Sequence, residues 1–134
     1  MSQVVEFARE CLGTPFRHQG RACGVALDCA GVIVHCAKRL GIEHADMQGY
    51  PRLPYKNMLE QFMGAQPNLQ QLAWERREPG DVILMRIKEA PQHLGIYVGG
   101  DYMIHSFEAI GRVIEQRIDE QWLKKIIAVY RFIQ

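Results

Sequence analysis

The fold depends most on residues 28–41, which read DCAGVIVHCAKRLG. This segment predicts a helix from Asp28 to Leu40, because an aspartate is a good N-cap and a glycine such as Gly41 favours the stop. After the cap, the residues are apolar apart from His35 until the last turn. A helix with so few polar positions is typical of a buried element, so we expect it at the centre of the domain.

The segments on either side of this helix predict a mixed domain. Upstream, the apolar residues of segment 2–12 follow the spacing of an amphipathic helix, namely Val4, Val5, Ala8, Cys11 and Leu12. Downstream, we expect a short helix over 55–63 and a polar linker over 64–71. Five later segments predict strands: 82–87, 93–98, 102–107, 112–118 and 126–133. Helices followed by strands indicate an α+β class, with helices N-terminal and an antiparallel sheet C-terminal.

Composition supports one domain over residues 1–134 and excludes several classes of protein. Hydrophobic residues make up 48% of the chain and charged residues 23%, which is typical of a globular domain. The net charge of +1 argues against a nucleic-acid partner. No apolar run approaches the roughly 18–20 residues of a membrane span, and the N-terminus lacks the pattern of a signal peptide. We therefore expect a chain made in the cytoplasm with no membrane span.

The four cysteines are Cys11, Cys23, Cys29 and Cys36. Disulfides are not expected without a secretory signal. No Cys-x-x-Cys or Cys-x-x-His pair occurs, so we expect no metal site. The first and last are interpreted as buried thiols, and Cys23 as a partly buried bystander. Cys29 differs because it lies at the predicted helix N-terminus, where free N–H groups and the helix dipole stabilise a thiolate and an oxyanion.

Two histidines on the predicted strands complete a candidate triad. A three-residue hairpin loop over 99–101 would pair Val98 with Tyr102 and place His93 and His105 as diagonal neighbours on one face. This register gives Cys29 as nucleophile, His93 as base and His105 as orienter. A two-residue loop would instead separate the histidines. The alternative is that these residues are an ordinary core cysteine and satisfied polar histidines.

Five short motifs lie in order along nearly the whole chain: Leu12-Gly13-Thr14-Pro15-Phe16, Asp28-Cys29-Ala30-Gly31, Pro79-Gly80-Asp81, His93-Leu94-Gly95-Ile96-Tyr97 and Ile104-His105. Each alone is common, but in this order and spacing they resemble the NlpC-type cell-wall cysteine peptidases. The stretch from Pro15 to Arg21 most resembles the branch found in phage tails and prophages.

The resemblance implies a compact papain-like fold. It also implies hydrolysis of peptide bonds in bacterial murein, typically after the γ-linked D-glutamate of the stem peptide. Residue by residue, Cys29 matches the nucleophile, His93 the general base and His105 the orienting residue. No metal or organic cofactor is implied. The phage branch implies a protein that acts at the cell wall from a virion tail, with other tail-tip proteins as partners.

The loop before Cys29 supplies candidate substrate-binding residues. We expect His18 and Arg21 to line the cleft and bind a substrate carboxylate, because loop residues are enriched in function. The alternative is that they belong to a solvated basic loop. Asp28 is first a helix cap and second a partner for a substrate amine. Phe16 stands where many members of the family have tyrosine, so it lacks that hydroxyl donor.

These departures keep two other functions open. The family often has serine where Ala30 stands, and that serine helps to hold the substrate in well-known members. The chain is therefore also considered as a catalytically weak or inactive tail component for assembly or binding. A third alternative is an amidase or acyltransferase that acts on a non-murein amide through the same thioester chemistry.

Overall fold

The computed structural model describes residues 2–51, 58–87 and 91–133. For Pro91 it describes the backbone alone. Three helices form most of its helical part: α1 (Gln3–Arg9), α2 (Cys29–Leu40) and α3 (Met58–Gly64). The prediction of α2 is confirmed at both ends. The Asp28 side chain accepts a hydrogen bond from the Gly31 N–H at 2.9 Å, and Gly41 has the left-handed φ of 71° that ends a helix. None of the helices within the described residues has the length and apolar character that a membrane span needs.

The strands form a six-stranded antiparallel sheet in the order β3–β8–β4–β5–β6–β7. They are β3 (Leu69–Leu72), β4 (Val82–Arg86), β5 (Pro91–Gly99), β6 (Tyr102–Phe107), β7 (Arg112–Arg117) and β8 (Ile126–Phe132). A small hairpin, β1 (Arg21–Ala22) and β2 (Ala26–Leu27), precedes α2. Two short helices, η1 (Trp74–Arg76) and α4 (Glu120–Leu123), join the later strands. The predicted α+β class is confirmed.

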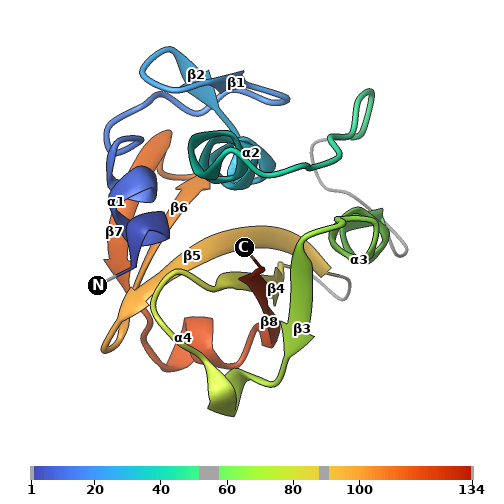
Figure 1. Ribbon diagram of the computed structural model, residues 1–134. Helices are drawn as coiled ribbons and strands as arrows, with labels where there is room; N and C mark the ends of the chain where they lie inside the picture. The colour runs from blue at the N-terminus through green and yellow to red at the C-terminus, as the bar shows by residue number, and fades with distance from the viewer. Residues whose placement is uncertain (1, 52–57, 88–90, 134) are drawn as a thin grey trace.

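Both faces of the sheet are covered. Figure 1 shows α1 and α2 on one side of β5 and α4 on the other. Leu94, Ile96 and Ile104 pack in the core shared with the long helices, whereas Tyr97 and Met103 pack in a second core with the tryptophans of η1 and α4. Alternate residues of β5 and β6 therefore enter different cores, as the period of a strand requires.

The hairpin between β5 and β6 keeps the predicted register, although its loop differs. Ile96 pairs with Ile104, as expected. The predicted three-residue loop is wrong, because Gly99 pairs with Tyr102 and leaves a two-residue turn. The register shifts between Tyr97 and Gly99, and the extra residue of this bulge compensates for the shorter turn. The two histidines consequently stay on one face.

Two segments differ from the sequence-based expectation, and a third can be compared only in part. The loop expected before Cys29 contains the β1–β2 hairpin, whose strands are too short to show alternation. The predicted polar linker 64–71 contains most of β3, which pairs with β8. Helix α3 begins at Met58, and the predicted start at 55–57 lies outside the described residues.

Candidate active site

The structure places Cys29 and His93 in one cavity of about 180 Å³. Cys29 is the first residue of α2 and is half-buried, while His93 comes from β5 and is almost fully buried. Three of the predicted substrate-binding residues line the same cavity: Phe16, His18 and Asp28. The cavity is therefore lined by the Cys29 thiol at the helix start, by the His93 imidazole and by residues of the loop that precedes α2.

Behind His93, two further side chains form a hydrogen-bonded chain. His93 Nε2 lies 2.7 Å from His105 Nδ1, and His105 Nε2 lies 2.7 Å from Gln116 Oε1. The Gln116 oxygen only accepts, so His105 carries its proton on Nε2 and accepts at Nδ1. His93 then donates from Nε2, which leaves its Nδ1 with a free lone pair. The chain thus fixes the tautomer that a general base needs.

Sequence analysis missed Gln116. It lies on β7, where Met103 of β6 pairs with it, and it is therefore a diagonal neighbour of His105 across the β6–β7 pair. The same register argument that united the two histidines would have identified it, had the β6–β7 turn been specified.

Burial keeps the cysteine and both histidines uncharged. Burial and the charge of the neighbouring Asp28 carboxylate raise the pKa of Cys29 to about 12, opposed in part by the backbone N–H groups of Leu94 and Ala30. Burial, with His105 alongside, holds the pKa of His93 well below its ordinary value of 6.5. Burial also lowers the pKa of His105, opposed by its hydrogen bond to Gln116. At this helix start, the loss of solvation opposes the stabilisation of a thiolate that is expected from the free N–H groups and the helix dipole.

This burial predicts that the protein loses stability as the pH falls below about 6.5. The unfolded chain takes up protons on His93 and His105 there, whereas the folded chain, with its lowered pKa values, does not. The free energy of unfolding should fall by up to about 1.4 kcal/mol per pH unit for each histidine. Urea unfolding at pH 7.5, 6.5 and 5.5 measures this slope. His93→Gln should flatten it, and an unchanged slope in that variant would contradict the assignment.

The carboxylate of Asp28 organises the loop that leads to Cys29. Its Oδ1 accepts from the Gly31 N–H at 2.9 Å and from Arg21 Nη1 at 2.8 Å. Its Oδ2 accepts from the Gln19 N–H at 2.9 Å and from the Tyr50 hydroxyl. Asp28 is 4% exposed, so this buried charge is satisfied by four donors. The predicted cap is confirmed, and it also serves as the centre of a network.

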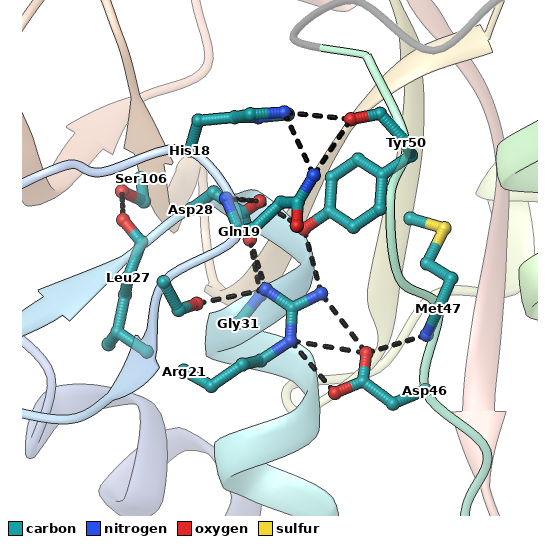
Figure 2. Close-up of polar contacts among 11 residues, drawn as sticks. His18, Gln19, Arg21, Leu27, Asp28, Gly31, Asp46, Met47, Tyr50 and Ser106 are labelled. Carbon is teal, nitrogen blue, oxygen red and sulfur yellow. Dashed lines mark hydrogen bonds and ion pairs between the residues drawn. The ribbon is translucent and has the colours of Figure 1, made fainter.

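Arg21 completes this network (Figure 2). Its Nε and Nη2 donate to the Asp46 carboxylate at 2.9 and 3.0 Å, and Nη2 also donates to the Tyr50 hydroxyl at 2.7 Å. Its Nη1 donates to Gly20 O at 2.9 Å as well as to Asp28. Among the described residues that line the cavity, Arg21 is absent. The geometry therefore favours Arg21 as a positioning residue for the start of α2 over a contact to substrate.

Two close contacts fix the start of α2 against the sheet and the loop. Ser106 Oγ, on β6 next to His105, donates to Leu27 O at 2.7 Å. At Gly31 a Cβ would overlap Gly20 O, so only glycine lets the loop cross the helix this closely. Through these contacts, α2 and β6 hold the cysteine and the histidines in a fixed relation.

A thiol at a helix start beside an imidazole chain on an antiparallel sheet is an arrangement suited to cysteine hydrolases. The chain belongs to the NlpC/P60 family, whose model matches residues 13–131. Members of this family are generally cysteine peptidases that hydrolyse peptidoglycan. Among curated proteins, no sequence matches the chain.

Solved structures of the same family share the fold. An NlpC/P60 family protein from Bacillus cereus has 20% sequence identity and a TM-score of 0.72 over 98% of this chain and 39% of its own. The peptidoglycan hydrolase RipB from Mycobacterium tuberculosis has 19% identity and a TM-score of 0.68, over 98% of this chain and 66% of its own. RipD from the same organism, a non-catalytic protein adapted to peptidoglycan binding, has 17% identity and a TM-score of 0.63, over 100% of both chains.

At these identities the likeness shows the fold and no more. The chain spans less than half the length of several solved structures that it matches, including the one from Bacillus cereus.

Proposed function

We propose that this chain is a cysteine peptidase or amidase that hydrolyses peptide bonds of murein stem peptides. The observation that supports this most strongly is the shared cavity of Cys29 and His93, with the His93–His105–Gln116 chain behind it. An imidazole whose tautomer is fixed, next to a thiol, is what nucleophilic catalysis requires.

In the proposed reaction, Cys29 starts as a neutral thiol. His93 Nδ1 takes its proton as the sulfur attacks the amide carbonyl carbon. The imidazolium then gives that proton to the leaving amine, the C–N bond breaks and a thioester remains. Water attacks the thioester with His93 again as base, the C–S bond breaks and the thiol regains its proton. Backbone N–H groups at the start of α2 stabilise the oxyanion.

Gln116 is a positioning residue in this scheme. Gln116→Leu removes the acceptor for His105 Nε2 and frees both tautomers, so we expect kcat to fall roughly 10- to 100-fold. Gln116→Glu is the matched control: it keeps the acceptor and activity, and its charge moves the acid limb of the kcat–pH profile to higher pH. An unchanged kcat in Gln116→Leu, with a wild-type pH profile in Gln116→Glu, would remove Gln116 from the mechanism.

The scissile bond that we propose follows γ-linked D-glutamate. The family membership and the resemblance of the motifs support this choice. The test is incubation of the chain with L-alanyl-γ-D-glutamyl-diaminopimelate and mass spectrometry of the products. Release of diaminopimelate supports the proposal. Cleavage of another amide, with this peptide left intact, would support the alternative of a non-murein substrate.

A second candidate function is binding without catalysis. It is supported by the structural likeness to non-catalytic RipD and by two residues of the cavity wall, Phe16 and Ala30, that depart from the common family pattern. Measurable affinity for the stem peptide, together with no hydrolysis by the wild type, would favour this function.

We further propose that the chain acts as part of a phage tail, at the cell wall, with other tail-tip proteins as partners. The resemblance of the Pro15–Arg21 stretch supports this. Copurification of the chain with tail proteins tests it, and a chain found only outside virions would contradict it.

A further inference from the structure

A second cluster of reactive side chains lies away from the active-site cavity. The sulfur atoms of Cys11 and Cys23 and a ring nitrogen of His35 all lie within 4.8 Å of one another. The three residues come from the turn after α1, from the β1–β2 turn and from the middle of α2. Two thiols and an imidazole form a donor set that zinc prefers in proteins.

The surroundings of this cluster suit a metal ion. Cys11 is fully buried, whereas Cys23 and His35 are half-buried and leave a way in from solvent. The Glu10 carboxylate lies 2.9 Å from His35 Nε2 and also accepts from Arg39. A carboxylate on a histidine nitrogen is a common support for a metal-binding imidazole.

We propose that Cys11, Cys23 and His35 bind one Zn²⁺ ion. Tetrahedral zinc, with Zn–S of about 2.3 Å and Zn–N of about 2.0 Å, places its ligand atoms roughly 3.5 Å apart. The three ligand atoms, which lie within 4.8 Å of one another, therefore need to move only slightly closer together to bind the ion. Water or the Glu10 carboxylate takes the fourth position. The imidazole either coordinates through Nδ1 or gives up its contact with Glu10. The third donor favours a metal over a simple disulfide between the two cysteines.

The ion would be structural. It would join α1, the β1–β2 hairpin and α2, and that hairpin begins at Arg21, which holds the Asp28 carboxylate next to Cys29. A metal that binds only the folded chain raises its stability by mass action. The sequence shows no sign of this site, because its ligands lie at positions 11, 23 and 35 and lack the short spacings of known zinc motifs.

The test uses the full chain with Cys29→Ala, which removes the thiol of the active-site cavity as a competing ligand. With a reductant present, this protein should bind one Zn²⁺ per chain and show a thiolate charge-transfer band with Co²⁺. Its melting temperature should rise with Zn²⁺. Added to this background, Cys23→Ser and, separately, His35→Gln should each weaken Zn²⁺ binding at least 100-fold while circular dichroism stays unchanged. The absence of binding, or affinity that neither substitution changes, would overturn the proposal.

Discussion

Cys29→Ala should lose at least about 1,000-fold in kcat/KM for the stem peptide, because the reaction then has no nucleophile to form the thioester. The loss should occur with little change in stability, since the side chain is half-buried and alanine is tolerated at a helix start. Hydrolysis followed by mass spectrometry measures the rate, and thermal unfolding measures the stability.

The matched control for this experiment is Cys36→Ala, a substitution on the same helix outside the cavity. Cys36 is fully buried, so its loss should reduce stability and leave turnover nearly unchanged. Turnover that survives in Cys29→Ala and is lost in Cys36→Ala would show that the nucleophile is wrongly assigned.

Asp28→Ala should cost about 2–4 kcal/mol of stability, the largest stability effect that we expect of any single substitution in the network. The variant loses the cap of α2 and leaves the Arg21 side chain, which is only 19% exposed, without its buried partner. The Tyr50 hydroxyl loses an acceptor at the same time. Urea unfolding at pH 7.5 gives the difference in free energy.

Two controls separate the parts of this effect. Asp28→Asn keeps a capping oxygen but removes the charge. Its free energy of unfolding should therefore lie between those of the wild type and Asp28→Ala. Asp46→Ala breaks the more exposed ion pair of Arg21, and it should cost less than about 1 kcal/mol. Equal losses in Asp28→Ala and Asp46→Ala would mean that the buried carboxylate does not organise the loop.

The parts of the fold that the sequence predicts depend on local rules. Asp28 and Gly41 predict the N-terminal cap and the C-terminal end of α2, because both act within one turn of the helix. The meeting of His93 and His105 follows from strand alternation across one hairpin. It survives the wrong loop length because a bulge restores the register.

The parts that sequence analysis missed depend on residues distant in the chain or on burial. Tyr50 and Asp46 reach the Asp28 network from a loop whose path no pattern specifies. The raised pKa of Cys29 comes from its burial in the folded chain and from the Asp28 charge beside it, and the local argument from the helix dipole included neither.

The central claim is that hydrolysis passes through an acyl-thioester on Cys29, and trapping with hydroxylamine tests it most directly. During turnover of L-alanyl-γ-D-glutamyl-diaminopimelate, hydroxylamine should divert part of the product to the γ-hydroxamate of L-alanyl-D-glutamate. The wild type should form it, and Cys29→Ala should form neither product. Hydrolysis that yields only the carboxylate at every hydroxylamine concentration, or that continues in Cys29→Ala, would indicate direct attack by water and contradict the account.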